Sequence, residues 1–194
     1  MQINSTLNYF KEHIDQLGGF WTPNRFMCRI IPPTLVQFRN RQYGGLSTRN
    51  LQLSCTSTSV PGRTLSTNAV MAPGPEQKYP YQDAFEDIEL TFHCTINNET
   101  EKSSVLGLKE KRFFDAWLHT ICNQTTMLMA YSDSYKAAEF KLYLFDNKDN
   151  QIAIYKFDRA YPISVGSIEL SHESEEIATF PVTISYDRWT YGDI

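Results

Sequence analysis

The chain has 194 residues, enough for one domain with a sizeable core, and its 41% hydrophobic and 21% charged residues exclude an intrinsically disordered protein. The longest apolar runs extend over only a few residues, which predicts no membrane-spanning segment, and the first residues lack the pattern of a secretory signal. The formal net charge of −4 disfavours a general nucleic-acid binder, because such proteins neutralise phosphates with a surplus of Lys and Arg.

Charged residues are distributed unevenly along the chain. The segment from Asn24 to Asn50 has five arginines and no carboxylate, whereas the segment from Asp83 to Glu101 has six carboxylates and no Lys or Arg. A further acidic cluster lies between Glu169 and Glu176. For any single cluster a solvated loop is the favoured interpretation, while the set as a whole suits electrostatic complementarity between copies of one chain.

Residues 1–23 are interpreted as an N-terminal amphipathic helical extension. Apolar residues recur there at steps of four, three, four and three, which is the period of one helix face. Asn4 or Ser5 suits the start of the helix, and Gly18-Gly19 suits its end. A lone amphipathic helix must cover another surface, either its own domain or a neighbouring subunit. The apolar residues are Ile3, Leu7, Phe10, Ile14 and Leu17.

From residue 24 onward the apolar period changes to two, which predicts a single β domain over residues 24–194. Strands are predicted at Phe26–Ile30, Leu51–Thr58 and Ile88–Ile96, where apolar and polar residues alternate. Such strands bury one face and expose the other to water, as in antiparallel sheets.

The segment from Pro61 to Phe85 contains several Pro and Gly residues and is predicted to be a long loop rather than a hairpin. Its aromatic residues argue against disorder, so contact with another surface is expected to order it. The stretch from Glu99 to Leu108 is predicted to be an exposed loop. Apolar residues at helical spacing then predict one internal helix. They are Phe113, Phe114, Trp117, Leu118 and Ile121.

The remaining chain predicts further strands. Phe140–Leu144 and Ile152–Phe157 flank a typical hairpin turn at Asp146–Asn150. A change of apolar phase at Gly166 predicts a β-bulge, and a last strand covers Ala178–Tyr186. The predicted fold is mainly β: two packed antiparallel sheets, in a sandwich or partly open barrel, with one flanking α-helix and the N-terminal helix.

No sequence pattern indicates catalysis. Phosphate-binding loops, nucleophile elbows and zinc-protease motifs are absent, and the four histidines are scattered, which disfavours a metal centre. Glu86, Asp87 and Glu89 resemble an acid–base pair, but such pairs come from distant segments in most folds. We therefore predict no enzyme, no catalytic or metal-binding residue and no cofactor.

The four cysteines are widely spaced and form no Cys-x-x-Cys pair. Three of them fall at inward positions of predicted strands, which favours reduced, buried thiols of a cytoplasmic protein over a pair of disulfides. Cys122, three residues after His119 on the predicted helix, is interpreted as a core residue with an inert thiol.

An ordered series of short motifs resembles the tail tube proteins of contractile-tailed, T-even-like bacteriophages. No single motif is specific, and the resemblance depends on their order over roughly residues 24–189. The motifs are Leu53-Ser-Cys55, Val60-Pro-Gly62, a Gly-Pro and Tyr-Pro segment, Asp87-Ile-Glu-Leu-Thr-Phe92, Arg112-Phe-Phe-Asp-Ala-Trp117, Tyr131-Ser-Asp-Ser-Tyr135, Leu144-Phe-Asp146, Ala160-Tyr-Pro162 and Phe180-Pro-Val-Thr-Ile-Ser-Tyr186.

The resemblance implies a structural protein of the virion tail rather than an enzyme. In this family, strands from every subunit of a hexameric ring join into one inner β-barrel. The rings stack into a tube inside the sheath, and genome DNA passes through the lumen. The implied partners are further copies of the chain, the tail sheath protein, baseplate tube-initiator proteins and a tape measure protein in the lumen, with assembly in the host cytoplasm.

The lumen wall is expected on strand faces with small polar side chains. A polar wall with few cations lets DNA slide, because Lys and Arg would bind its phosphates. The alternative is that these faces meet bulk solvent in a monomer. The lumen candidates are Ser54, Thr56, Thr58, Glu89, Thr91, Thr95, Thr183 and Ser185. The candidates for ring stacking and inter-subunit contacts are Arg39, Arg41, Tyr79, Tyr81, Phe85 and Asp87.

Two features depart from the family pattern: the extension over residues 1–23 and an insertion at residues 97–108. They leave open whether the chain is a repeating tube subunit, a baseplate tube initiator or the tube subunit of a related contractile injection system. A tail-associated hydrolase and a monomeric β-sandwich binding module are the less favoured alternatives.

Overall fold

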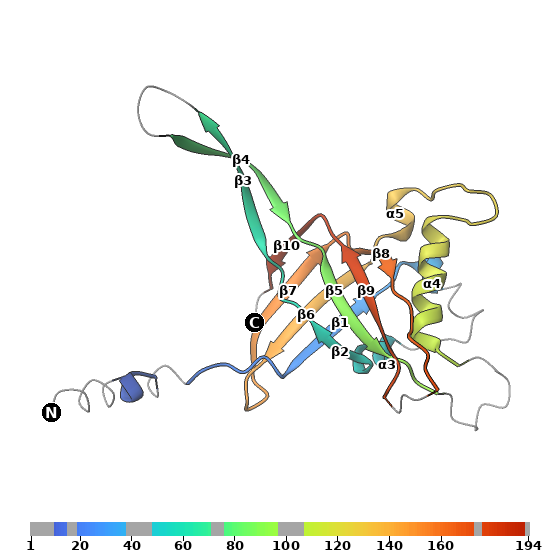
Figure 1. The fold of residues 1–194 in the computed structure, drawn as a ribbon, viewed down its shortest axis with the longest axis horizontal. Helices are drawn as coiled ribbons and strands as arrows, with labels where there is room; N and C mark the ends of the chain where they lie inside the picture. Colours follow the sequence, from blue (N-terminus) through green and yellow to red (C-terminus); the bar gives the residue numbers. More distant parts are fainter. Residues whose placement is uncertain are drawn as a thin grey trace.

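The computed structural model describes residues 10–14, 19–37, 48–70, 76–96, 107–172 and 176–192. They form two four-stranded antiparallel sheets and a two-stranded hairpin, with one long helix beside the sheets (Figure 1). The predicted fold class, mainly β with two packed antiparallel sheets and a flanking helix, is confirmed.

The first sheet, named the β6 sheet, has the strand order β1-β6-β7-β10. Its apolar residues alternate along each strand, so that they lie on one face: Cys28 is opposite Leu142, and Ile30 is opposite Phe140. These four side chains are buried. The strands are β1 (Phe26–Ile31), β6 (Glu139–Phe145), β7 (Gln151–Asp158) and β10 (Arg188–Tyr191).

The second sheet, named the β5 sheet, has the order β2-β5-β9-β8. Leu90 of its central strand is opposite Val182, and Phe92 is opposite Phe180, and all four side chains face the β6 sheet in one common core. The strands are β2 (Cys55–Thr58), β5 (Ile88–His93), β9 (Thr179–Ser185) and β8 (Tyr161–Val165).

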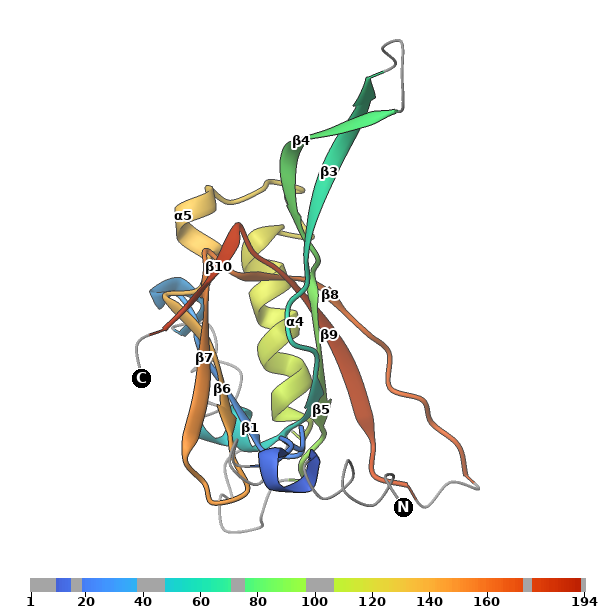
Figure 2. The ribbon, with the colours of Figure 1, turned by 90° about the vertical axis from the view of Figure 1, so that its left-hand side faces the viewer.

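Helix α4 (Lys109–Ile121) stands beside the two sheets and packs on β8 (Figure 2). Its buried face is aromatic: Phe114 lies 5.0 Å from Phe92 of the β5 sheet between ring centroids, and Trp117 is 1% exposed. The indole Nε1 of Trp117 donates a hydrogen bond of 2.7 Å to the carbonyl oxygen of Tyr135, at the end of α5 (Ser132–Tyr135). The predicted internal helix is therefore confirmed, and it closes one side of the core.

The prediction of a long loop over residues 61–85 is wrong. Strand β3 (Arg63–Val70) pairs with β4 (Gln77–Phe85) in an antiparallel hairpin that projects far beyond both sheets (Figure 2). Pro80 sits where the register shifts between Ser66 and Thr67, an irregularity that tolerates a residue without an N–H donor. Of the Pro and Gly residues in this segment, Pro80 therefore lies within a strand, and Pro61 and Gly62 precede β3.

The strand predicted over Leu51–Thr58 is correct only in its second half. Residues Thr48–Leu53 form helix α3, which packs on β1, and β2 begins at Cys55. Leu51 is 1% exposed and Leu53 is 77% exposed, which strand alternation would not allow for two residues of the same phase. The apolar residues Leu51, Leu53 and Cys55 alternate over too short a segment to distinguish the period of a strand from that of a helix.

Around Gly166 the structure also differs from the prediction. Strand β8 ends at Val165, and the register irregularity lies earlier, between Pro162 and Ser164. Gly166 is required for a different reason: a Cβ atom there would lie 2.5 Å from Cγ of Pro181, because the Gly166 N–H donates to the Pro181 carbonyl at 2.7 Å. The hairpin turn at residues 146–150 is confirmed by the Asp146 N–H to Asn150 carbonyl bond.

All four cysteines are free thiols, but only Cys28 is fully buried, so the prediction of buried thiols is wrong for Cys55, Cys94 and Cys122, which are partly exposed. Burial, reinforced by the adjacent Cys55 thiol, raises the pKa of Cys28 well above its ordinary value, which makes it a poor nucleophile. Among the helices that the structure describes, none is long and apolar enough to cross a membrane.

We expect Trp117→Ala to lower the free energy of unfolding by about 3–5 kcal/mol, because it leaves a large cavity between α4 and the sheets. Chemical denaturation measures this loss. The control is Tyr131→Ala, at a side chain that is 89% exposed, which should change stability by about 0.5 kcal/mol or less. Equal effects of the two substitutions would contradict the packing described for Trp117.

Candidate assembly surfaces

The open face of the β5 sheet has mainly small, polar side chains and no Lys or Arg. None of its four strands contains Lys or Arg. Glu89 is directly opposite Thr183, and Thr91 is opposite Pro181, so their side chains share the face turned away from the core. Ser185 has the same phase as Thr183 in β9. The structure thus brings four of the predicted lumen candidates together on one surface.

Three other lumen candidates lie elsewhere. Ser54 is 7% exposed and its hydroxyl hydrogen-bonds inside the chain, so it does not belong to an open face. A register shift in β2 places Thr58 opposite the buried Leu90, on the core side, while the exposed Ser57 takes the position opposite Thr91. Thr95 follows the end of β5 and bonds to a carboxylate of α4.

Ser57 is accordingly a residue of the open face that the sequence reasoning missed. Thr56, the remaining candidate, is exposed beside the shift, and its hydroxyl donates to the Thr91 carbonyl oxygen at 3.1 Å. No alternation pattern within the short segment Cys55–Thr58 could reveal a bulge, since one extra residue inverts every face that follows it.

The open face of the β6 sheet is charged instead. Arg29, Lys141 and Lys156 lie side by side across β1, β6 and β7. Glu139 lies among them: its Oε1 forms ion pairs with Lys141 Nζ at 2.7 Å and with Arg29 Nε at 3.8 Å. The contact with Lys141 is the main cause of the lowered pKa of Glu139, and the charges of Arg29 and Lys156 lower it further. The two outer faces of the molecule therefore differ in charge and polarity.

Glu110 in the first turn of α4 is a buried anchor for the β2 edge of the β5 sheet. Its side chain is 0% exposed. It accepts hydrogen bonds from the Thr95 hydroxyl at 2.6 Å, the Thr95 N–H at 3.2 Å and the Ser54 hydroxyl at 3.3 Å. Because Ser54 precedes β2 and Thr95 follows β5, one carboxylate links the helix to both strands.

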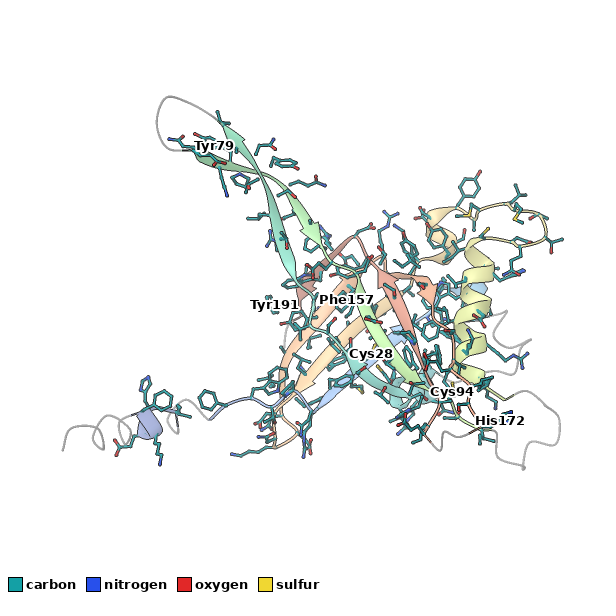
Figure 3. The ribbon with its side chains drawn as sticks, in the orientation of Figure 1. Cys28, Tyr79, Cys94, Phe157, His172 and Tyr191 are labelled. Atoms are coloured by element: carbon teal, nitrogen blue, oxygen red, sulfur yellow. The ribbon has the colours of Figure 1, made fainter. Side chains whose placement is uncertain are left out.

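The β3–β4 hairpin is the most exposed element among the described residues, and Figure 3 shows Tyr79 near its far end. Tyr79 and Tyr81 are 54% and 62% exposed. Asp83 pairs with Arg63 across the two strands, with Nη2 to Oδ2 at 2.7 Å. Tyrosine side chains on a projecting hairpin have a large contact area and little internal packing, which suits a contact with another molecule.

Tyr186 holds the base of this hairpin. Its hydroxyl donates to the Glu86 carbonyl oxygen at 2.7 Å, and its ring packs 6.3 Å from that of Phe85. Burial, with the carboxylates of Asp87 and Glu86 adding to it, raises the pKa of Tyr186 to about 12. Phe85, a predicted inter-subunit candidate, is therefore half-buried within its own chain, whereas Asp87 is exposed.

Other predicted contact residues have partners within the chain or lie outside the described ranges. Arg25 pairs with Asp149, and Arg29 with Glu139, so these two arginines do not need carboxylates of another copy. Arg39, Arg41 and residues 97–106 of the predicted insertion fall outside the described residues.

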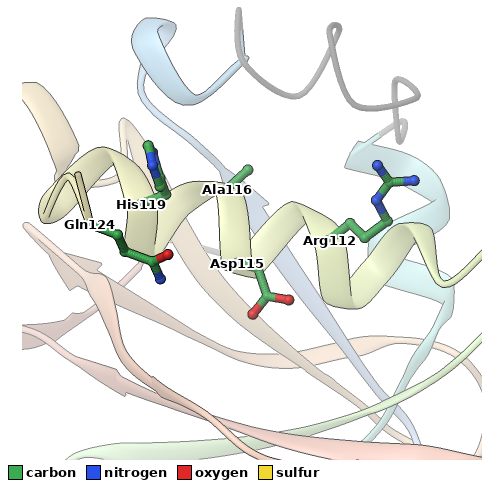
Figure 4. Close-up of a pocket in the computed structure, with 5 residues that line it drawn as sticks. All are labelled: Arg112, Asp115, Ala116, His119 and Gln124. Atoms are coloured by element: carbon green, nitrogen blue, oxygen red, sulfur yellow. The ribbon is translucent and has the colours of Figure 1, made fainter. Parts of the chain in front are cut away.

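Among the described residues, four surface hollows contain no catalytic arrangement of side chains. One of about 280 Å³ lies along α4 and is lined by a helix face with Arg112, Asp115 and His119 (Figure 4). The side chains of Asp115 and His119 extend in different directions in this view, and the Asp115 carboxylate lies 3.5 Å from Lys111 Nζ. Within the described part of the chain, no group of three or more His, Cys, Asp or Glu residues has the arrangement of a metal site.

The family model of phage tail tube proteins matches residues 21–192. The chain belongs to this family. No protein with a curated description matches it.

Solved structures of contractile injection machines have the same tail tube fold. The tube-terminating cap of the anti-feeding prophage is similar with a TM-score of 0.60 and 17% identity, over 90% of this chain and 92% of that chain. The sheath–tube complex of PVC, an extracellular contractile injection system, has a TM-score of 0.59 and 16% identity, over 94% of this chain and 97% of that chain. The six-fold symmetrised anti-feeding prophage baseplate has a TM-score of 0.57 and 12% identity, over 88% of this chain and 93% of that chain.

In this tail tube protein, Glu110→Ala should lower the free energy of unfolding by about 1–3 kcal/mol, because it removes a fully buried carboxylate and the hydrogen bonds that this carboxylate accepts from Thr95 and Ser54. The matched control is Asp115→Ala on the exposed side of the same helix, where the loss should be about 0.5 kcal/mol or less. Denaturant titration compares them, and an equally mild effect of Glu110→Ala would contradict the anchor.

The raised pKa of Tyr186 predicts a loss of stability at high pH. Below the ordinary tyrosine pKa of about 10 the contribution is fully present. Between pH 10 and about 12 the unfolded state ionises first, so the free energy of unfolding falls as the pH rises through this range. Tyr186→Phe should be less stable at neutral pH and show a shallower decline between pH 10 and 12. Parallel stability curves of the two proteins would refute this assignment.

Proposed function

We propose that copies of this chain form hexameric rings that stack into a tail tube, whose lumen conducts DNA. The observation that carries the proposal is the β5 sheet. Its strands alternate in direction, so edge strand β8 of one copy can pair antiparallel with edge strand β2 of the next. Repetition around a ring closes a barrel and leaves the β5 sheet without an exposed edge.

The dimensions suit this role. Six copies would contribute about 24 strands, which at about 4.8 Å spacing and about 40° tilt close into a barrel of roughly 50 Å backbone diameter. The open face with Glu89, Thr91, Thr183 and Ser185 then lines the lumen. A wall without Lys or Arg has no strong site for phosphate, so DNA or a tape measure protein passes without being held.

The remaining surfaces suit the other contacts of a tail. The charged face of the β6 sheet would lie on the outside of the ring, available to the sheath protein. The β3–β4 hairpin projects beyond the sheets, and its Tyr79 and Tyr81 would contact the adjacent ring. Baseplate initiator rings would contact the tube end in the same way. The subunit acts as a structural protein without catalysis, is assembled in the host cytoplasm and remains in the virion tail.

A second candidate function is a baseplate initiator ring. The observation in its favour is the N-terminal segment, since the family match begins only at residue 21. A segment outside the common fold is an available site for a contact that a repeating subunit does not make.

Electron microscopy of the purified protein over a concentration series tests the proposal. Stacked rings with a regular axial repeat support a tube subunit, and isolated rings support the initiator. In a reconstruction, Glu89 and Thr183 should line the lumen and Lys156 should lie outside. Monomers at every concentration, or a lumen lined by the β6 sheet, would refute the proposal.

The double variant Tyr79→Ser/Tyr81→Ser should form rings but about tenfold fewer stacked rings, because it removes two exposed aromatic contacts of the hairpin. The matched control is Ile152→Ser in β7, where a 42% exposed apolar residue is removed away from the hairpin. Counting rings and tubes on the same grids measures the effect. Unchanged stacking of the double variant would exclude the hairpin tyrosines from the contact.

A further inference from the structure

The N-terminal segment leaves the domain at the turn between β6 and β7. The indole Nε1 of Trp21 donates to the Phe145 carbonyl oxygen at 3.0 Å, and the Thr22 hydroxyl bonds to Asn147 at 2.7 Å. The helical turn over residues 10–14 lies far from both sheets (Figure 1). We name residues 3–17 the N-terminal arm.

The described part of the arm has apolar side chains that the domain does not cover. Phe10 is 57% exposed, and neither Phe10 nor Ile14 packs on the core. In the sequence both belong to the apolar series with Ile3, Leu7 and Leu17, which has the period of one helix face. A helix with this apolar face would need an apolar surface to cover, and residues 3–17 lie outside the part of the chain that matches the family.

An apolar groove lies on the opposite side of the same molecule. It has a volume of about 440 Å³ and runs between the C-terminal half of α4 and strand β8. Leu118 and Ile121 of the helix line it, together with Pro162 and Ile163 of the strand. Ile163 is 45% exposed, so the groove presents apolar surface to water.

The loop after α4 extends this groove and is held in place by its own hydrogen bonds. The Ala130 N–H donates to the Ile121 carbonyl at 2.8 Å, and the Asn123 N–H donates to the Leu128 carbonyl at 3.1 Å. Met127, Leu128 and Met129 are nevertheless 75%, 70% and 70% exposed. Methionine adapts its shape to an apolar partner, which suits a surface that receives a helix.

We propose that the N-terminal arm of one copy lies in the α4–β8 groove of the neighbouring copy. The inference rests on the proposed ring. In one copy, the helical turn over residues 10–14 lies on one side of the domain, and α4 with β8 lies on the other (Figure 1). Joining β8 to the next copy's β2 would therefore turn the arm side of that copy toward the groove. Surfaces on opposite sides of one protomer are what a head-to-tail ring requires. As a helix, the arm spans roughly 22 Å at 1.5 Å per residue, enough to follow the groove along α4.

Photo-crosslinking tests this arrangement without using the four native cysteines. Phe10→p-benzoylphenylalanine keeps an aromatic side chain on the apolar face of the arm. The matched control carries the same amino acid at Glu12, which lies on the opposite face of the helix. Assembled protein from a mixture of unlabelled and ¹⁵N-labelled chains is irradiated, and cross-linked peptides are identified by mass spectrometry.

We expect mixed-label cross-links from position 10 to residues 118–130 or 161–165, and about tenfold fewer such cross-links from position 12 because it faces away. Cross-links within one chain, cross-links to another surface or none at all would overturn the proposal. Electron microscopy of the same sample separates the two ideas. Rings or tubes without the expected cross-link overturn only the position of the arm, whereas the absence of any ring overturns the proposed function as well.

Discussion

Two sheets that each have a single apolar face must bury those faces against each other, and this constraint organises the whole molecule. Phe92 and Phe180 of the β5 sheet meet Phe114 of α4, while Phe140 and Phe157 of the β6 sheet stack 4.5 Å apart between ring centroids. With the inner faces buried, each outer face is free to differ. One is small and polar, and the other carries three basic side chains around a carboxylate.

Two buried polar side chains position the edge strand β2 and the β3–β4 hairpin, which are candidate assembly surfaces. Glu110 connects α4 to the start of β2 and the end of β5, and so positions the edge strand that a ring would use. Tyr186 connects the last strand of the β5 sheet to the base of the hairpin. Glu110 accepts three hydrogen bonds and Tyr186 donates one, and both side chains are buried, where an unmatched polar group costs more than at the surface.

The positions of individual side chains were predictable where the pattern was long. The alternation in Ile88–His93 and Thr179–Ser185 extends over enough residues to place Glu89, Thr91, Thr183 and Ser185 on one face. The alternation did not predict the positions of Ser54 and Thr58 correctly. A helix ends just before Ser54 and a register shift precedes Thr58, and the segment is too short for the sequence pattern to show either feature. The hairpin was missed because its prolines and glycines dominate the local signal, although β4 accepts Pro80 at a register shift.

The sequence by itself determined the mainly β fold, the internal helix and the family resemblance, because hydrophobic periodicity and motif order are local properties. The tertiary structure alone decided which faces are open, how the hairpin is held and on which sides of the molecule the arm and the groove lie. These depend on contacts between residues far apart in the chain, such as Thr95 with Glu110 and Tyr186 with Glu86, which no local pattern encodes.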